Sequence, residues 1–146
     1  MDAPRPRDQR IRDTRARLRH DVDAWFGTAG DDGPHLVPLS FLWHDDALLI
    51  ATEDASPTAR NLRSGGQVRV AVGPTRDVVL VEAAASVLDR LDAATGDSFA
   101  AKTGFDPRQM DNYTFYRVVP SEIRAWREVN ELAHRLLMRD GRWLDA

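Results

Sequence analysis

The sequence predicts a mainly β protein in which an antiparallel sheet closes, fully or in part, into a barrel. About six or seven segments have the length and alternation of strands, and tight polar turns join several of them. A doubly wound parallel sheet is disfavoured, because it needs a helix after nearly every strand, whereas hairpin turns connect strands here.

Turn residues divide the first half of the chain into strands. Gly30-Asp31-Asp32-Gly33 is typical of a hairpin, since Asp and Gly tolerate the positive φ that such turns require. His44-Asp45-Asp46 predicts a second turn. The strands that these turns separate are Ala24–Ala29, His35–Trp43 and Ala47–Thr52.

The second half of the chain mixes strands and helices. A helix is expected over Pro57–Ser64, with Ser56 as N-cap and Gly65-Gly66 ending it. Further strands are expected over Gln67–Val72, Asp77–Leu88, Tyr113–Val119 and Glu122–Trp126, the last ending at the sheet edge. Further helices are expected over Asp92–Lys102, with Gly104 just past its end, and over Glu128–Met138.

The N-terminal residues form an arginine-rich arm. Residues 1–7 are expected to be disordered because two prolines interrupt them, and a helix should follow over Asp8–His20, with Ile11, Leu18 and Val22 on one stripe. Interleaved aspartates and the lack of aromatic residues favour a solvated helix face over a nucleic-acid arm. We therefore expect an arm over residues 1–20 and a single domain over residues 21–146.

Composition excludes several classes of protein. The chain of 146 residues has a net charge of −3, which gives no overall attraction to nucleic acid or to an anionic membrane. It has no cysteine, so disulfides, thiolate metal sites and cysteine nucleophiles are absent. No apolar run approaches a membrane span or a signal peptide, and the expected location is the cytoplasm.

The segment from Leu48 to Leu62 contains a candidate phosphate site. Ser56 at the N-cap and Pro57 at the first helical position leave backbone N–H groups and the positive end of the helix dipole facing outward, with Arg60 within reach. The alternative is a well-capped surface helix without a ligand, because caps are commoner than anion sites.

Other catalytic and binding chemistry is disfavoured. The four histidines lack metal-ligand spacing, so no metal site is expected, and no serine lies in a nucleophile elbow. Gly-x-Gly-x-x-Gly and Walker-type loops are missing. We expect His35 to be half-buried at a strand start, and Trp25 and Trp43 to serve packing or an interface rather than a cofactor.

In the order of these elements the chain resembles the pyridoxamine 5′-phosphate oxidase-like split-barrel family of flavin and deazaflavin proteins. The resemblance runs from about Asp21 to Val87, with an echo at Arg142-Trp143-Leu144. The matching pieces, in order, are Asp32–Leu39, the strand ending Ala51-Thr52, Thr58–Leu62, Gln67–Val70 and Asp77–Glu82.

The resemblance implies a six-stranded antiparallel split barrel that forms a homodimer, with a flavin-type cofactor in each of two clefts at the interface. It implies that the strand containing Val37, Pro38, Leu39 and Ser40 lies along the flavin ring. It also implies a phosphate site, for which the candidates are Ala51, Thr52, Ser56, Thr58, Arg60 and Asn61. The partner subunit should cover the ring with an aromatic side chain, for which the candidates are Trp126 and Tyr113. Thr58 stands where many relatives carry a lysine. No catalytic residue is assigned.

Three functions follow as hypotheses. The first is an FMN-binding homodimeric oxidoreductase, acting on an unassigned small molecule, in which the flavin performs the redox step. The second keeps the fold and replaces FMN with the deazaflavin F420, which a longer basic groove including Arg63 and Arg69 would favour. The third is a non-enzymatic module that binds flavin, or that binds a partner through the arginine-rich first helix.

Overall fold

The computed structural model describes residues 1–145, which fold around one antiparallel sheet. The strands are β1 Asp23–Gly30, β2 Gly33–Ser40, β3 Leu42–His44, β4 Ala47–Glu53, β5 Gln67–Val72, β6 Val78–Val87, β7 Tyr113–Trp126, β8 Leu136–Arg139 and β9 Arg142–Trp143. The helices are α1 Arg7–His20, α2 Pro57–Ser64 and α3 Ala93–Thr103, with 3₁₀ turns η1 Pro107–Gln109 and η2 Val129–Glu131.

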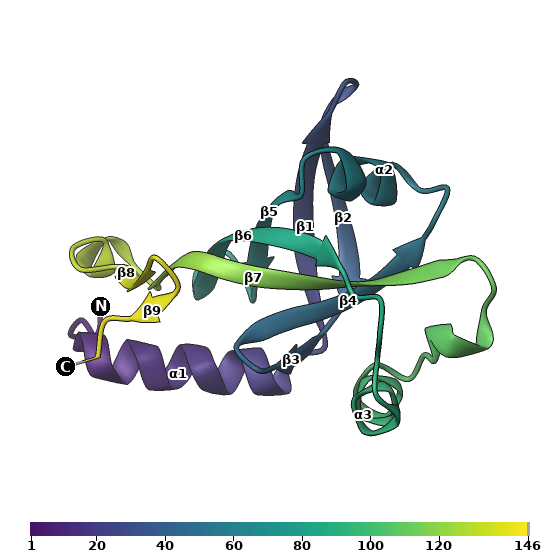
Figure 1. The fold of residues 1–146 in the computed structure, drawn as a ribbon. Coiled ribbons are helices and arrows are strands. Elements are labelled where there is room, and N and C mark those ends of the chain that lie inside the picture. The colour runs from purple at the N-terminus through teal and green to yellow at the C-terminus, as the bar shows by residue number, and fades with distance from the viewer. Residues whose placement is uncertain (146) are drawn as a thin grey trace.

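The sheet curls into a split barrel, as the sequence predicts. Its strand order is β2-β1-β5-β6-β7-β4-β3, all neighbours being antiparallel, and β8 and β9 extend the sheet beside β7. Because β2 and β3 are joined through Phe41 but stand at opposite ends of this order, the sheet bends round on itself. Figure 1 shows the long strand β7 crossing the middle of the molecule.

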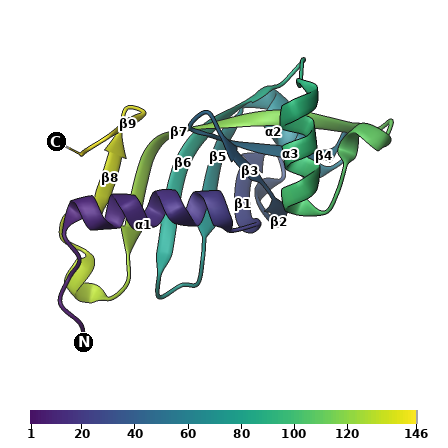
Figure 2. The same ribbon diagram turned by 90° about the horizontal axis from the view of Figure 1, so that it is seen from below.

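The core fills the inside of the curled sheet. Alternate residues of β5 and β6 point inward, as the buried Val68, Val70 and Val72 of β5 show. Phe26, Tyr116 and other apolar side chains from the remaining strands join them. Helix α1 lies across the strands in Figure 2, whereas α2 lies at the opposite side of the sheet in Figure 1.

Two predicted strand boundaries are wrong. The strand expected over His35–Trp43 breaks at Phe41, because this side chain is buried and its N–H donates to Val22 O at 2.9 Å instead of a ladder partner. The strands expected over Tyr113–Val119 and Glu122–Trp126 are one strand, β7. The pairing with β6 slips at Pro120, where a bulge accommodates the extra residue.

The predicted edge position of Glu122–Trp126 is also wrong. This part of β7 pairs with β6 on one side and with β8 on the other. The helix expected over Glu128–Met138 does not form: η2 and β8 replace it. His134 has a φ of 59°, which a helix does not allow, and Glu131 is drawn inward to a buried arginine.

The N-terminal segment is ordered and packed, contrary to the expectation of disorder over residues 1–7, and α1 has the predicted apolar stripe. Ile11 and Leu18 belong to the main core, with exposed fractions of 2% and 0%. Val22, expected on the same stripe, follows the helix and is half-buried. Arg5 and Arg10 are buried, while Arg12 remains exposed. Helix α1 therefore packs on the rest of the fold through its apolar stripe, and the face that carries Arg12 remains exposed. No helix within residues 1–145 has the length and apolarity to span a membrane.

Arg5 and Glu131 form the buried ion pair that ties the N-terminus to the C-terminal part of the chain. Arg5 donates to the Glu131 carboxylate through its backbone N (2.8 Å), Nε (2.9 Å) and Nη2 (2.8 Å). The Arg127 backbone N–H also donates to it at 2.8 Å. The side chain of Arg5 in particular holds the pKa of Glu131 down at about 2.

The stability of the protein is expected to fall in acid through Glu131. Its pKa is depressed in the folded state from 4.5, so its contribution is complete above pH 4.5 and is lost as the pH falls towards 2. The contribution is on the order of 3 kcal/mol. Urea unfolding of the wild type and of Glu131→Gln between pH 7 and pH 2 should show the variant less stable at pH 7, with the gap closing in acid.

Glu128→Gln is the matched control for this experiment. Glu128 pairs with Arg76 at the surface, where an ion pair contributes little. A gap between wild type and Glu131→Gln that stays constant down to pH 2 would contradict the assignment.

Candidate functional site

The outer face of the sheet carries a row of apolar side chains. Cross-strand register places Trp25 of β1 opposite Pro38 of β2 and Ala71 of β5, and Ala71 opposite Leu80 of β6. Trp25 and Leu80 are exposed over 50% and 39% of their surface. Because successive residues of a strand face opposite sides, the same strands that fill the core also present this row to the outside.

A groove runs over this face and past the β1–β2 hairpin; we call it the outer groove. It consists of three adjoining cavities that share residues. The first, of about 400 Å³, lies between Gly30–His35 and α2. The second, of about 520 Å³, shares Pro34 and His35 with the first. The third, of about 460 Å³, shares Gly27, Leu36 and Arg69 with the second and ends at Trp25 and Trp126. Volumes of this size are usual for small-molecule sites.

Helix α2 begins as the sequence predicts. The Ser56 hydroxyl accepts from Ala59 N at 3.0 Å, and Pro57 occupies the first turn. Thr52 Oγ1 lies 3.1 Å from Ser56 Oγ, so the end of β4, which also contains the half-buried Ala51, meets the cap. Thr58 is buried with an exposed fraction of 2%. Thr52, Ser56 and Thr58 thus support the helix start, and they do not line the outer groove.

Arg60 and Asn61 are the two expected phosphate residues that line the outer groove. Arg60 is exposed, and its Nη1 donates to Ala55 O at 3.0 Å, which holds the guanidinium at the N-terminal end of α2. Asn61 Nδ2 donates to Thr28 Oγ1 at 3.1 Å and joins α2 to β1. The two residues therefore place one cation and one amide at the hairpin end of the groove.

The strand expected along the flavin ring is β2, which forms one end of the strand order. Pro38 faces outward beside Trp25 and lines a neighbouring cavity of about 460 Å³. Val37 and Leu39 are half-buried, and Leu39 packs against the core. Ser40 Oγ donates to Asp23 Oδ1 at 2.5 Å. Pro38 is thus the member of this set that adjoins the groove.

Trp126 and Tyr113, the two aromatic residues expected to cover the cofactor ring, lie far apart. Trp126 lines the third cavity, and the Arg135 guanidinium lies 5.7 Å from its ring centroid, within cation–π range. Tyr113 stands at the other end of β7, where its ring meets Phe105 at 5.4 Å. A strand of 14 residues spans roughly 45 Å, so Tyr113 and Trp126 of one chain do not share a site.

Sequence reasoning missed several groove residues, among them His35, Leu36, Leu80 and Arg135. It expected Trp25 in the core or at an interface, and the exposed half of its surface rules out the core position. The alternation of β1 gave a signal for Trp25, because Ala24, Phe26 and Thr28 fill the inner positions. Arg135 gave none, because it was placed on a helix that does not form.

Charges in the third cavity are mostly paired. Arg69 pairs with Glu82 at 2.5 Å and Arg124 with Glu122 at 2.9 Å. Within residues 1–145, no carboxylate lies within 4.0 Å of the Arg135 guanidinium. Arg135 is therefore the cation of this cavity that is available to an anionic or electron-rich group. In the same described range, no cluster of three or more His, Asp or Glu side chains suits a metal ion.

A model of the pyridoxamine 5′-phosphate oxidase family matches residues 13–127. The chain belongs to this family. No curated protein matches it significantly. The C-terminal Trp143 of this pyridoxamine 5′-phosphate oxidase family member packs against the core under Arg15, at 4.7 Å, and it does not line the groove.

Solved structures share the fold. A FAD-binding protein from Mesorhizobium loti superposes with a TM-score of 0.64 at 18% identity, over 77% of this chain and 89% of that one. A heme storage protein from Vibrio cholerae superposes with a TM-score of 0.66 at 14% identity, over 78% of this chain and 92% of that one. An F420 reductase superposes with a TM-score of 0.60 at 17% identity, over 74% of this chain and 93% of that one. The family fold is thus found in proteins named for different ligands.

Gly30→Ala is expected to separate the β1–β2 hairpin from α2. A Cβ at Gly30 would lie 2.1 Å from Asn61 Oδ1, so the Asn61 side chain must move and lose its bond to Thr28. The loss should cost about 1–2 kcal/mol of unfolding free energy, measured by urea titration.

Gly65→Ala is the control, because a Cβ there meets nothing within 4 Å. Adding Asn61→Ala to Gly30→Ala should remove the clash, so the two changes should cost less together than the sum of the two separately. Simple additivity would show that Gly30 and Asn61 do not interact.

Proposed function

We propose that this protein is a cytoplasmic, FMN-binding homodimeric oxidoreductase whose cofactor lies in the outer groove. The observation that carries the proposal is the continuity of the groove from Arg60 at the start of α2 to Trp25 and Trp126 on the open sheet face. One end offers polar donors and the other offers aromatic and apolar surface, which is the distribution of a flavin mononucleotide.

The hairpin end of the groove carries hydrogen-bond donors that could bind a phosphate. The Arg60 guanidinium is a charge-assisted donor, and Asn61, Ser64 and His35 add polar groups around the same cavity. Asp31 and Asp32 on the hairpin also line it and oppose an anion, so Arg60 must outweigh them. Thr52, Ser56 and Thr58 would act indirectly, by fixing the start of α2 from which Arg60 projects.

The sheet end fits a flat, largely apolar ring system that a second chain covers. The row formed by Pro38, Trp25, Ala71 and Leu80 lies open in the single chain. A bound cofactor is normally buried over most of its surface, and the sheet face of a single chain can cover only one side of it. A second copy packed on this row would bury the row and enclose the groove, so the proposed site needs two chains.

The chain's own residues would bind and orient the cofactor, because the two hydroxyls that line the described groove, those of Thr28 and Ser64, are hydrogen-bonded to Asn61 and not to a base. When bound, FMN supplies hydride or electron transfer. Val37–Ser40 would lie at the rim beside the ring, and Ala51 would act from the end of β4, where Thr52 meets the Ser56 cap. Arg135 would place positive charge beside Trp126, where it favours an anionic state of the bound group.

F420 on the same fold is the alternative, supported by the similarity to an F420 reductase. The groove favours FMN, because Arg69 and Arg124 are neutralised by Glu82 and Glu122 and leave little basic surface for an anionic tail. Arg63 does not extend the groove, since it lies outside the cavity and its Nη2 donates to Asp54 O at 3.1 Å.

Retained FMN is the expected result when the purified protein is mixed with FMN or with F420, dialysed and examined by absorption spectroscopy. Arg60→Ala should weaken FMN binding by about 1–3 kcal/mol, the scale of a charge-assisted hydrogen bond, as measured by fluorescence titration.

Arg63→Ala is the matched control, since it removes an arginine from the same helix without touching the groove. Retention of F420 instead of FMN would favour the alternative cofactor. Equal affinity in Arg60→Ala and wild type would remove Arg60 from the site, and a protein that retains neither cofactor would refute the redox assignment.

A further inference from the structure

The N-terminal segment is bonded to the loop at residues 127–135 by two buried arginines. Arg5 holds the Glu131 carboxylate through three hydrogen bonds, as described above. Arg10, 3% exposed, binds carbonyls instead: its Nη1 donates to Glu131 O at 2.7 Å and its Nη2 to Ala133 O at 3.3 Å. We call Arg5, Arg10 and Glu131 the N-terminal clasp.

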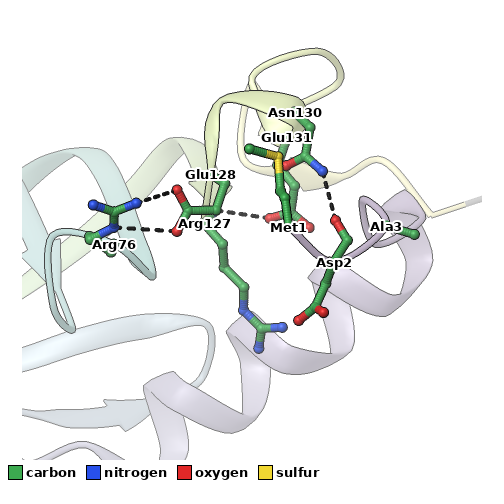
Figure 3. Close-up of a pocket in the computed structure, with 8 residues that line it drawn as sticks. All are labelled: Met1, Asp2, Ala3, Arg76, Arg127, Glu128, Asn130 and Glu131. Atoms are coloured by element: carbon green, nitrogen blue, oxygen red, sulfur yellow. Dashed lines mark hydrogen bonds and ion pairs between the residues drawn. The ribbon is translucent and has the colours of Figure 1, made fainter.

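The clasp reaches both ends of the loop. Arg10 Nη1 also lies 3.3 Å from Ala125 O at the end of β7, and Arg10 Nε donates to Arg5 O at 3.0 Å. Figure 3 shows residues 1–3 beside the loop, with Asn130 Nδ2 donating to Asp2 O at 2.8 Å. The loop has little regular structure of its own besides η2, so these bonds from a distant part of the chain fix its path.

The far end of the loop forms a wall of the outer groove. Arg135 O accepts from Ala125 N at 3.0 Å, and Arg135 Nη1 donates to Leu132 O at 2.9 Å. These bonds set the guanidinium over Trp126, and both side chains line the third cavity. Arg135 is thus placed by the loop that the clasp holds.

We infer that Arg5 and Arg10 are positioning residues for the cofactor groove: the N-terminal segment holds the loop that places Arg135 over Trp126. The inference rests on the proposed function for its ligand, because FMN is the group whose binding Arg135 would affect. The structural claim, that the clasp fixes the loop and the loop fixes Arg135, depends only on the contacts described above. Neither arginine touches the groove, so both act through the loop.

The test combines hydrogen exchange of the loop with FMN titration in Arg5→Met, which keeps the length of the side chain and removes its donors. We expect the amides of residues 125–135 to exchange about tenfold faster or more, and FMN to bind roughly 2- to 30-fold more weakly. Arg5→Lys keeps the charge without the bidentate fork, and it should loosen the loop less.

Two controls separate this effect from general destabilisation. Leu18→Ala removes core packing on the same helix without touching the loop bonds, and Arg12→Met removes an exposed arginine of α1. Neither should change loop exchange relative to the rest of the sheet. Arg135→Gln should weaken FMN binding by itself, and adding Arg5→Met should weaken it no further, because both act through one group.

The outcomes are distinguishable. Unchanged exchange of the loop in both Arg5 variants would overturn the inference, and so would a loosened loop in a chain that still binds FMN as tightly as wild type. If the wild type binds no FMN, the proposed function fails, while exchange of the Ala125 amide, which reports the bond to Arg135, still decides whether the clasp holds the loop.

Discussion

The pleat of the sheet is the constraint on which both the fold and the groove depend. Side chains alternate between two faces, so the strands that bury Phe26, Val70 and Val81 inside must present Trp25, Ala71 and Leu80 outside. In an antiparallel sheet with one buried face, the face exposed to solvent is commonly polar. Here the outer positions in this row are apolar, and a contiguous exposed apolar patch marks an interaction surface more often than a bare face. The row is best explained as a surface that another molecule covers.

Helix α2 and the β1–β2 hairpin turn this open face into a groove with a polar end. Asn61 bonds to Thr28 across the gap, and the absence of a side chain at Gly30 allows that close approach. Arg60 projects from the next position of the same helix, held at Ala55. The polar end is thus built by a capped helix and the β1–β2 hairpin, and the apolar end by the sheet.

Local patterns predicted much of this architecture. Turn residues, caps and alternation located β1, β4, β5 and all three helices to within a residue or two, because these elements are set by neighbours in the sequence. The failures all involve distant partners. The break at Phe41 depends on Val22, the continuity of β7 on its pairing with β6, and the path of residues 127–135 on Arg5 and Arg10. The residues that line the groove follow the same rule. Arg60 was predicted from the helix cap and Asn61 from the family resemblance, whereas the position of Arg135 depends on the clasp.

We propose that the outer groove becomes a cofactor site when two chains meet on the apolar row. The most direct test is the FMN dissociation constant measured over a range of protein concentrations, with the mass of the species followed by sedimentation equilibrium. If two chains form the site, we expect one FMN per chain, binding that weakens as dilution separates the chains, and a shift of the equilibrium towards the dimer when FMN is added. A monomer that binds FMN with an affinity independent of protein concentration would contradict it.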